Sequence, residues 1–508
     1  MTGKTKDGLS IGVLESITAE EKAEIAYFDQ RGQQTVEPMT NYFVGRVQKG
    51  FNKGETILGG MITAVNRNIS NEHLNFLHRA AYTGGFDFLY TWKERTYYLG
   101  VKGIFSHVKG DEAAIYRTQT SSSRYFQRPD ANHLSLDSSR TSLSGYGGTV
   151  RIGKKGSGRI RFESSLTVRS PGLELNDIGY MRYADKIHHG TWMGYYIREP
   201  FSIFRNFHLN LNYWLLWNFD RKLLSQHVNM NFNTQFKNYW YFNGSLTRNF
   251  ESLSSTLLRG GPSFLNPGYW SLNFNVSSDR RKKFYYNFGR WLGIWDNNTS
   301  INTSYWGGCT FRPSNAMKLS MYPNYGHNID KLQYVTQVET EGSTRYIFAK
   351  INQKTIGISL RLSYTLTPNL SIQFYGMPFI SAAKYSSMKR ITDPRADQFT
   401  ERFHTFTSEE IKVNSEDENY SIDEDGDGET DYTIDFPDFN FRQFQSNLVI
   451  RWEYQPGSTL FLVWSQGRTG CITDGNFAYY NDMRDLFSIY PHNVFFLKFN
   501  RLFFIVLL

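Results

Sequence analysis

The stretch TIGISLRLSYTLTPNLSIQFYGMPFI, residues 355–380, decides the fold class of this chain. In its first arm, apolar side chains occupy every even position from Ile356 to Leu366, and Gly, Ser, Arg and Thr fill the odd positions between them. A strict period of two places the apolar side chains on one face of a β-strand and the polar side chains on the other. Pro368 and Asn369 then provide a tight reversal, so the stretch predicts a β-hairpin.

Two kinds of sheet contain strands with one apolar and one polar face. One is a soluble sheet with a single wet face, and the other is a transmembrane barrel with lipid outside and water inside. The alternating arm runs for about eleven residues, and at about 3.3 Å per residue and a tilt near 45° it spans the apolar height of about 25 Å that a membrane barrel presents to lipid. Strands of soluble sheets are usually about five or six residues long. Strand length therefore favours the barrel.

The composition agrees with a large β protein. The 508 residues include 14 Pro and 42 Gly, and 17% are aromatic, which suits rows of side chains at membrane interfaces. An aromatic-rich soluble β protein is the alternative. No run of about 18 apolar residues occurs, which excludes membrane-spanning helices. The net charge of +9 is spread along the chain, so nucleic acid is not an expected partner. Cys309 and Cys471 form neither a disulfide framework nor a metal cluster.

The two ends of the chain are unusual for an exported protein. The N-terminal residues MTGKTKDGLSIGVL contain no apolar signal core. We therefore expect either an intracellular protein or a fragment that lacks a signal peptide and an upstream region. The C-terminal residues VFFLKFNRLFFIVLL begin as an alternating strand and lose their period after Asn500, which indicates an altered end.

Strands are predicted along most of the chain. Within 228–236 and 270–277, apolar residues alternate with Asn, Ser and Gln. Asparagine is a poor strand former, so rows of it on one face need water or a polar interior there, while the opposite face needs an apolar solvent. The segment 111–140 breaks the pattern. The predicted N-terminal strands are Gly8–Thr18, Tyr42–Phe51, Glu55–Arg67, Tyr82–Trp92, Thr96–Gly110, Ser142–Lys155 and Arg159–Arg169.

The lengths of the predicted connections are an independent indication of a membrane barrel. Outer-membrane barrels have short periplasmic turns and long external loops in alternation. The predicted long connections are Tyr322–Ser343, Ser381–Gln443 and Gly467–His492. The predicted short turns are Asp279–Lys283, Pro313–Ala316, Pro368–Asn369 and Gln455–Ser458, with Asp296–Thr299 as a short turn on the loop side. We predict one domain over residues 1–508, an all-β transmembrane antiparallel up-and-down barrel of about 18 strands, within a range of about 16 to 20.

The acidic segment DEDGDGETD lies inside the longest predicted loop. Asp423, Asp425, Asp427 and Asp431 alternate around Gly426 and Gly428, as in the first part of an EF-hand calcium loop. The match is incomplete, because Ile434 stands where the bidentate Glu belongs and Asp435 follows it. These four aspartates are either a calcium site that orders an external loop or a solvated acidic loop.

Other polar clusters have structural explanations beside functional ones. Asp185, His188 and His189 could form a metal or acid–base site, but adjacent histidines on a strand point to opposite faces, so loop or interfacial histidines are the preferred interpretation. Arginines with neighbouring aromatic residues could bind an acidic sugar or a lipid headgroup, or could line the lumen or a loop, which we prefer. That second group is Arg117, Arg124, Arg128 and Arg140 with Tyr116, Tyr125 and Phe126. No catalytic residue is predicted, because no spacing identifies a nucleophile.

Three stretches, Arg117–Gly148, Arg169–Asp185 and Asp423–Gln466, resemble a family of uncharacterised outer-membrane barrel domains of Gram-negative bacteria. In that family, the barrel is a domain of unknown function that lies C-terminal to a family-9-like carbohydrate-binding domain. The resemblance covers residues 3–500 and implies an outer-membrane location, a signal peptide and an upstream domain that contacts glycans. This sequence departs from the family in lacking both of those segments, and also in its tail beyond Asn500.

Three functions fit this sequence. The first is a porin-like channel or uptake barrel for a solute such as a saccharide, embedded in outer-membrane lipid. The second is a non-conducting surface scaffold whose loops bind a glycan or a partner protein. The third is a membrane-embedded hydrolase, which we expect least, so the chain is not predicted to be an enzyme.

Overall fold

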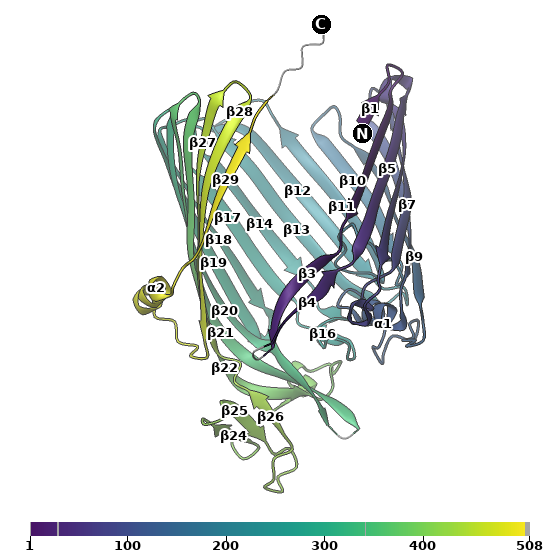
Figure 1. The fold of residues 1–508 in the computed structure, drawn as a ribbon, viewed down its shortest axis with the longest axis vertical. Helices are drawn as coiled ribbons and strands as arrows, with labels where there is room; N and C mark the ends of the chain where they lie inside the picture. The colour runs from purple at the N-terminus through teal and green to yellow at the C-terminus, as the bar shows by residue number, and fades with distance from the viewer. Residues whose placement is uncertain (1, 28–29, 341, 503–508) are drawn as a thin grey trace. The chain divides into compact units, whose positions relative to one another are not determined.

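A computed structural model describes residues 2–27, 30–340 and 342–502 of the chain, and strands dominate it (Figure 1). The described residues contain two α-helices, α1 (Glu112–Thr120) and α2 (Tyr479–Ser488). In this part of the chain, neither helix has the length and apolar composition that crossing a membrane would need. Short 3-10 turns lie at Asn52–Gly54, Glu72–Leu74, Asp296–Asn298 and Phe399–Arg402.

Over the described ranges, 22 strands belong to one large antiparallel sheet. The hydrogen-bonded pairings of these residues include none that closes the sheet on itself. Its first eleven long strands and the short β1 are β1 (Thr2–Lys4), β2 (Leu9–Thr18), β5 (Met39–Phe51), β6 (Thr56–Asn68), β7 (Ala80–Trp92), β8 (Tyr97–Lys109), β9 (Ser142–Lys154), β10 (Ile160–Arg169), β11 (Lys186–Ile197), β12 (Phe204–Trp217), β13 (Leu223–Phe236) and β14 (Tyr241–Asn249). The others are β17 (Tyr269–Ser277), β18 (Phe284–Trp295), β19 (Ser300–Ser314), β20 (Met317–Thr340), β21 (Ser343–Thr367), β22 (Leu370–Ile391), β23 (Phe403–Thr405), β27 (Phe439–Gln455), β28 (Ser458–Ile472) and β29 (His492–Asn500).

Three small sheets belong to the connections. They are the hairpin β3 (Glu21–Tyr27) and β4 (Gln30–Glu37), the pair β15 (Ser252–Ser254) and β16 (Phe264–Asn266), and the three-stranded sheet β24 (Ile411–Asn414), β25 (Asn419–Ile422) and β26 (Tyr432–Asp435). The last sheet lies beyond the ends of β20–β22 that are opposite the turns at 315–316 and 368–369 (Figure 1).

The chain divides into two compact units. The first comprises Met1–Tyr196, Leu209–Asn229 and Asn249–Asn266, and the second comprises Ile197–His208, Met230–Arg248 and Pro267–Leu508. In the first unit, β2 pairs with β5, and each of β5 to β10 pairs with the next strand. In the second unit, the same nearest-neighbour order runs from β17 to β22 and then through β27, β28 and β29. Within these two runs, each strand therefore pairs with the next long strand of the large sheet along the chain, as an up-and-down sheet requires.

The hairpin predicted at 355–380 is confirmed. Strands β21 and β22 are antiparallel, and Thr367 lies opposite Leu370 across the turn. The tight turn predicted at Gln455–Ser458 is also present, and Gly457 adopts a φ of 76° there, a left-handed value that glycine accepts without a steric penalty.

The strand number was underestimated. The prediction was about 18 strands, whereas the sheet contains 22 in the described ranges. Two of them, β1 and β23, are only three residues long. No strand bounds were predicted within residues 170–199, where β11 lies.

The long connection predicted at Tyr322–Ser343 was wrong. Strands β20 and β21 continue through this segment as a hairpin of 24 and 25 residues. The two strands stay paired there, although the register shifts twice, first between Asp330 and Gln333. Backbone hydrogen bonds maintain the strands where the side-chain alternation has disappeared, because strand pairing itself needs no particular side chain.

Alternation of short and long connections is confirmed in the first unit, and in the second unit only from β21 onward, because β18–β19 and β20–β21 are joined by short connections as well. In the second unit the short turns are 278–283, 315–316, 368–369 and 456–457, and the long connections are 392–438 and 473–491, both narrower than predicted. The predicted short turn on the loop side is present at 296–299. In the first unit, short turns at 52–55, 93–96 and 155–159 alternate with connections at 69–79, 110–141 and 170–185. The predicted loss of period after Asn500 falls mainly on residues 503–508, outside the described residues.

Candidate functional site

One face of the second unit is apolar from strand to strand. Cross-strand partners lie on the same face of a sheet, and the pairing register joins one such row across six strands. Its members are Leu319, Leu362, Phe374, Leu448, Trp464 and Phe495. Side chains on this face are about half exposed, for example Trp270 at 49%, Leu272 at 48% and Leu462 at 47%. Helix α2 contacts this face at one end, where the ring centres of Phe487 and Phe444 are 5.1 Å apart.

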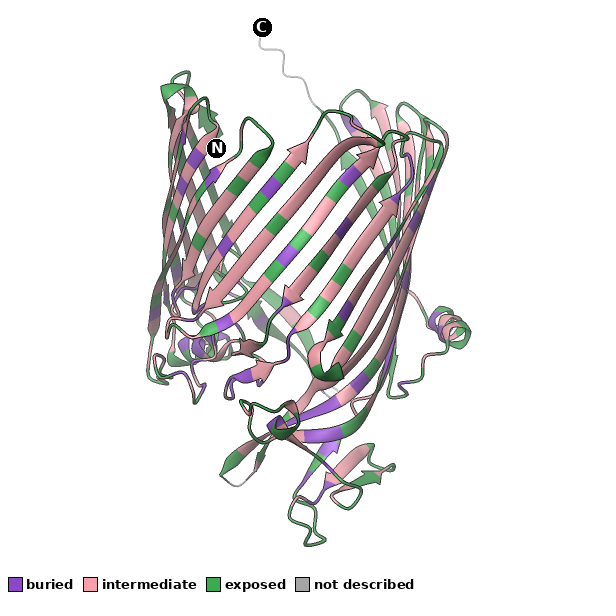
Figure 2. Ribbon diagram, turned by 180° about the vertical axis from the view of Figure 1, so that it is seen from behind, coloured by how far each residue is buried: buried purple, intermediate pink, exposed green. Residues whose placement is uncertain are grey.

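The opposite face of the same strands is polar. One residue along from the apolar row, the partners are Thr310, Ser320, Arg361, Tyr375, Asn447 and Ser465. Hydroxyl groups of this face bond to each other, as between Thr310 Oγ1 and Ser320 Oγ at 3.1 Å. Exposed residues recur along the strands at short intervals (Figure 2). The wall is therefore a single β-sheet with an apolar surface on one side and a polar surface on the other.

The first unit repeats this arrangement. Ile62, Phe105 and Tyr146 lie on one face and are 57%, 61% and 52% exposed. On the other face, Thr63 and Thr83 are cross-strand partners whose Oγ1 atoms are 2.6 Å apart. An apolar surface of this extent is unusual on a water-soluble monomer.

A neutral polar hollow lies against β19, β20 and β21 in the second unit. It has a volume of about 320 Å³, and its lining includes Asn302, Ser304, Asn324, Asn328, Gln353 and Thr355, with no carboxylate, lysine or arginine among the lining residues. Beside it, the Trp306 Nε1 group donates a hydrogen bond of 3.2 Å to Asn275 Oδ1. Amide and hydroxyl groups both donate and accept hydrogen bonds, so this lining can exchange them with the hydroxyl groups of a solute.

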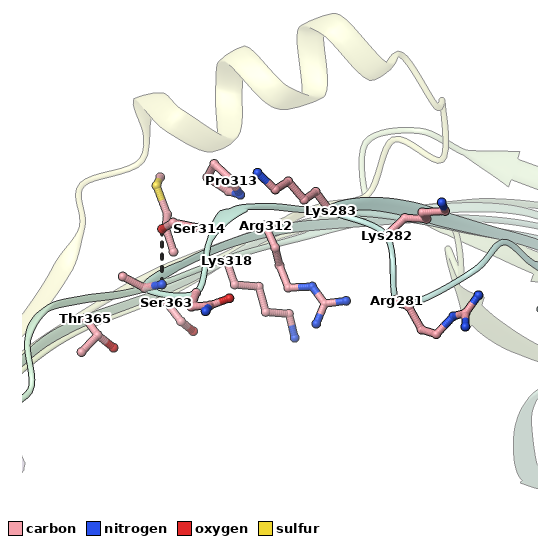
Figure 3. Close-up of a pocket in the computed structure, with 12 residues that line it drawn as sticks. Arg281, Lys282, Lys283, Arg312, Pro313, Ser314, Lys318, Ser363 and Thr365 are labelled. Atoms are coloured by element: carbon pink, nitrogen blue, oxygen red, sulfur yellow. Dashed lines mark hydrogen bonds between the residues drawn. The ribbon is translucent and has the colours of Figure 1, made fainter.

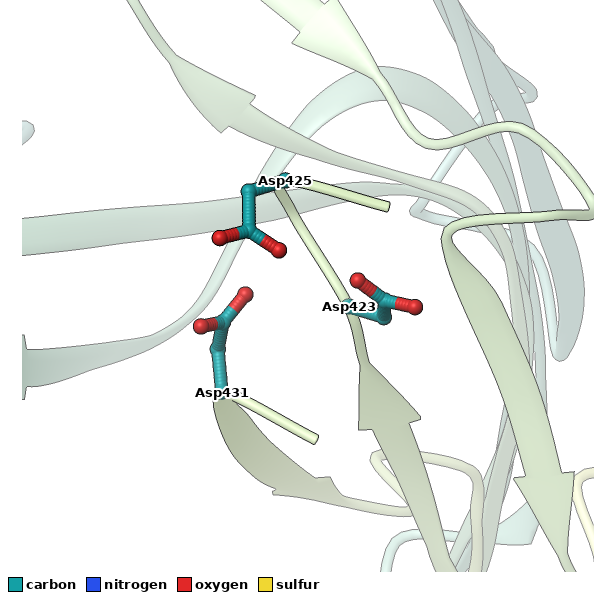
Figure 4. A group of neighbouring side chains, drawn as sticks. All are labelled: Asp423, Asp425 and Asp431. Atoms are coloured by element: carbon teal, nitrogen blue, oxygen red, sulfur yellow. The ribbon is translucent and has the colours of Figure 1, made fainter. Parts of the chain in front are cut away.

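The acidic segment forms the loop between β25 and β26 (Figure 4). Carboxylate oxygens of Asp423, Asp425 and Asp431 all lie within 4.8 Å of one another. Asp423 is buried, and its two oxygens accept backbone hydrogen bonds from Gly426 and Gly428 at 2.8 and 3.0 Å. Clustered carboxylates are the ligand type that Ca²⁺ prefers, so these three residues fit a calcium ion.

The fourth predicted ligand, Asp427, is outside that group of three. Its Oδ1 accepts a hydrogen bond from the backbone of Glu429 at 2.9 Å. Ile434 cannot supply a ligand, because its side chain is buried in an apolar cluster with Ile422 and Tyr432. Glu424 is not available as a calcium ligand either, because its Oε2 forms ion pairs with Arg345 at 3.0 Å and with Arg390 at 3.2 Å. Calcium binding by the aspartates stays a prediction.

Asp185, His188 and His189 do not form a site together. His188 lies opposite Thr167 and His189 opposite Leu166, which places the two histidines on opposite faces of the sheet as predicted. The carboxylate of Asp185 instead contacts Arg128 at 3.0 Å and His133 at 2.9 Å.

The arginines of 117–140 do not form one binding surface. Arg124 is buried and pairs with Glu174 at 2.9 Å, and Arg128 is buried against Asp185. The Arg117 guanidinium lies 4.8 Å from the ring centre of Phe76, and Arg140 is 3.8 Å from Asp137. Arg124 and Arg128 therefore stabilise loop packing, which excludes them from contact with a sugar or a lipid headgroup.

A buried cluster in the first unit has no counterpart among the sequence-based predictions. Asp177 bonds to Arg67 at 2.6 Å and to His78 Nδ1 at 2.8 Å, and His78 Nε2 is 2.7 Å from Thr118 Oγ1. Burial acts to raise the pKa of Asp177, but the hydrogen bonds and charges of His78 and Arg67 outweigh it and lower that pKa below its usual value. The partners are about a hundred positions apart in the sequence, so no local signal could have revealed them.

With this wall and its loops described, the chain can be placed in a family. Residues 1–410 match the family described as "Domain of unknown function (DUF5916)", and the chain belongs to it. The predicted membership in a family of unknown function is thereby confirmed, whereas the association with a carbohydrate-binding domain stays a prediction. No curated protein matches the chain.

Among solved structures, large receptors are similar to the chain at low identity. The siderophore receptor PirA from Acinetobacter baumannii is 9% identical, with 91% of this chain and 76% of that chain covered and a TM-score of 0.37. The ferric enterobactin receptor PfeA is 8% identical, with the same coverage and a TM-score of 0.37. FpvAI, in its complex with pyocin S2, is 9% identical, with 86% and 68% covered and a TM-score of 0.39. Overlaps at TM-scores this low do not define a shared function.

Proposed function

We propose that the chain is an outer-membrane β-barrel through which a hydroxyl-rich solute, such as a saccharide, passes or is taken up. The single observation that supports this proposal most is the one-layer wall with a continuous apolar face opposite a polar face. In water, the half-exposed apolar side chains would forgo the stabilisation of about 1.5–3 kcal/mol that full burial gives a large apolar side chain. In a bilayer the same side chains contact acyl chains, and the backbone groups are satisfied by strand pairing.

The polar hollow beside Asn324 and Gln353 supports the choice of solute. Its lining offers neutral donors and acceptors, which recognise sugar hydroxyls without the desolvation cost of a buried charge. Gln353 Nε2 also donates to Ser381 Oγ at 3.0 Å, so neighbouring hydroxyls hold the amide in place.

Single-channel conductance of the refolded full chain in planar bilayers tests this proposal. Heat-modifiable gel mobility is the check that the protein has folded. Stable open steps that maltotriose blocks are the expected result. Asn324→Ala and Gln353→Ala should weaken that block, whereas Asn447→Ala, on the polar face outside the hollow, should not. A folded protein without current would contradict a channel.

A second candidate is a non-conducting scaffold that binds a glycan or a partner protein through its loops. The observation that favours it is the connection 392–438, which carries its own three-stranded sheet and shares an apolar core with β21 and β22. Current-free folded protein that loses glycan binding when residues 411–435 are deleted would support this alternative.

A further inference from the structure

The short-turn end of β18–β21 carries a concentration of positive charge, here called the basic patch. It consists of Arg281, Lys282, Lys283, Arg312, Lys318 and Arg361. Two hollows adjoin it. The larger, of about 580 Å³, is lined by the first five of these residues together with Ser363 and Thr365 (Figure 3). The smaller, of about 490 Å³, is lined by Lys318 and Arg361 with Ser320, Tyr322, Ser359 and Ser363.

The register places the centre of the basic patch on the polar face. Lys318 lies opposite Ser363, and Arg361 lies opposite Ser320 and Tyr375. The next residues along, Leu319 and Leu362, pair on the apolar face. Arg281, Arg312 and Lys318 extend to the same side of the ribbon (Figure 3). A ligand of these cations is therefore dissolved in water, because lipid would cover the other face.

Carboxylates balance little of the positive charge of the basic patch. Asp279 bonds to Arg281 at 2.8 Å, and this hydrogen bond lowers the pKa of Asp279 to about 2, so that pair is neutral overall. Within the described ranges, no ion pair joins a carboxylate to Lys282, Lys283, Arg312, Lys318 or Arg361. Close like charges repel each other, and a bound anion relieves that repulsion.

We propose that the basic patch binds an oxyanion, a phosphate or carboxylate group carried by the solute, on the polar face of the wall. This inference rests on the proposed function and narrows its substrate class to solutes that bear such a group. A guanidinium holds an oxyanion through two parallel hydrogen bonds, whereas an ammonium acts as a compact charge. Rings of arginine and lysine are also what confers anion selectivity on pores.

Neighbouring groups hold the two arginines ready for a ligand. The Arg312 guanidinium lies 5.0 Å from the ring centre of Tyr285, and that of Arg361 lies 5.2 Å from the ring centre of Tyr375. Stacking on an aromatic face leaves the edge of a guanidinium able to donate hydrogen bonds, and Arg312 already donates one from its Nη2 to the backbone carbonyl of Arg280. The hydroxyl groups of Ser320 and Tyr322, which lie within 3.3 Å of Thr310 Oγ1, add further donors.

Titration calorimetry of the refolded full chain with inorganic pyrophosphate tests the basic patch directly. Lys318→Gln and Arg361→Gln should each weaken binding about tenfold, the effect of losing one charged hydrogen-bond partner. Lys102→Gln is the matched control, because Lys102 is a polar-face cation in the other unit, opposite Asp87 and Thr149. It should leave the affinity unchanged. Rising salt should weaken binding to the native chain, since these charges are open to solvent.

Bilayer measurements separate this proposal from the proposed function. If the chain conducts, the reversal potential in a salt gradient should show a preference for anions that Lys318→Gln reduces. If the chain does not conduct but Lys318→Gln still loses pyrophosphate, the basic patch is supported and the channel is not. Equal pyrophosphate affinity in the native chain, Lys318→Gln and Arg361→Gln overturns the basic patch, whatever the conductance. Binding that disappears in bilayers with anionic lipid, but not in zwitterionic ones, assigns the charges to headgroups and overturns a solute site.

Discussion

The wall of the second unit and the loop module, defined as residues 392–438, use the same apolar residue types in opposite ways. In the loop module, Ile422 and Ile434 are 0% and 2% exposed and pack with Met388 and Phe406. In the wall, Leu272 and Leu462 are about half exposed and face outward. The loop module encloses its apolar side chains together with Ile347 and Ala349 of β21 and Met388 of β22, as a water-soluble domain does. Under the proposed membrane location, lipid covers the apolar side chains of the wall that no protein layer covers.

The polar groups also differ between the two regions: those of the loop module form ion pairs, and those of the wall are mostly neutral. The Glu424 carboxylate of the loop module accepts hydrogen bonds from Arg345 of β21, from Arg390 of β22 and from the Tyr432 hydroxyl. Burial, followed by the hydrogen bond to Glu424, raises the pKa of that hydroxyl. The polar face of the wall relies largely on neutral amides and hydroxyls. Closed ion-pair networks fix a loop in one arrangement, whereas neutral groups open to water remain available to a passing solute.

The largest expected effect concerns the core of the loop module. Ile434→Ala should destabilise the loop module by about 2–5 kcal/mol, because it removes buried methyl groups and leaves a cavity. Limited proteolysis at increasing urea concentration measures this loss. Val413→Ala, at a 66% exposed position of the same sheet, is the control and should change the stability by less than about 0.5 kcal/mol. If Ile434→Ala also abolished heat-modifiable mobility, the loop module and the wall would be one cooperative unit.

The next effect concerns the two faces of one strand. Leu272→Arg should destabilise the bilayer-inserted protein by about 2–4 kcal/mol, the cost of a cation on a lipid face near the membrane centre. Asn273→Arg, one residue along and on the polar face opposite Trp291, should cost much less. Urea unfolding from lipid vesicles compares the two variants. Equal losses would show that the faces are not in different solvents.

Calcium should stabilise the loop module and leave the wall unchanged. At a free concentration 100 times its Kd, calcium binding adds about 2.7 kcal/mol to the free energy of unfolding. Asp425→Asn with Asp431→Asn should abolish this gain, whereas Asp427→Asn should reduce it less, because Asp427 is outside the group of three. Protease resistance in calcium and in chelator measures the difference. The same resistance in both media would mean that the aspartates form only a solvated loop.

The smallest effect is a pH dependence within the loop module. Burial acts to raise the pKa of Glu410, but bonds from the Thr407 backbone and from His404 outweigh it and lower that pKa below 4.5. A lowered pKa stabilises the fold above the unfolded value, and this stability is lost as the pH falls through the folded value. Glu410→Gln should therefore cost less than about 1 kcal/mol at pH 7, since the pair is partly exposed.

As the pH falls through the lowered folded pKa of Glu410, the native loop module and the Glu410→Gln variant should converge in stability, because the carboxyl group becomes protonated in both states of the native chain. Glu409→Gln, at the exposed neighbouring position, should show no such pH dependence. A difference between native and Glu410→Gln chains that persisted at pH 3 would contradict this account.

The strict period of two explains which parts of the fold could be predicted from the sequence. Alternation from Ile356 to Leu366 predicted the hairpin, its faces and its turn, because the side-chain pattern and the backbone agree there. The extension of β20 beyond Tyr322 could not be predicted, since the period of two is lost where Lys331 follows Ile329 on one face and Leu332 follows Asp330 on the other. Its strand exists because β21 is there to pair with it.

The candidate sites, like the strands, were predictable only where their residues are close together in the sequence. Asp423, Asp425 and Asp431 are close in the sequence, so their grouping was predictable. Lys318 and Arg361 are brought together by pairing between strands, and Asp177 meets Arg67 across loops. No local pattern signals such encounters. The expected absence of enzyme activity stays a prediction.

The most direct test of the membrane-wall account is spin-label accessibility along β21 in lipid vesicles. Cys309 and Cys471 would be replaced by Ser, and single cysteines placed from 356 to 366 would carry the label. We predict a period of two, in which even positions collide with lipid-soluble oxygen and odd positions collide with a water-soluble nickel reagent. Equal access of the water-soluble reagent to both sets of positions would contradict the account, because both faces of the wall would then be in water.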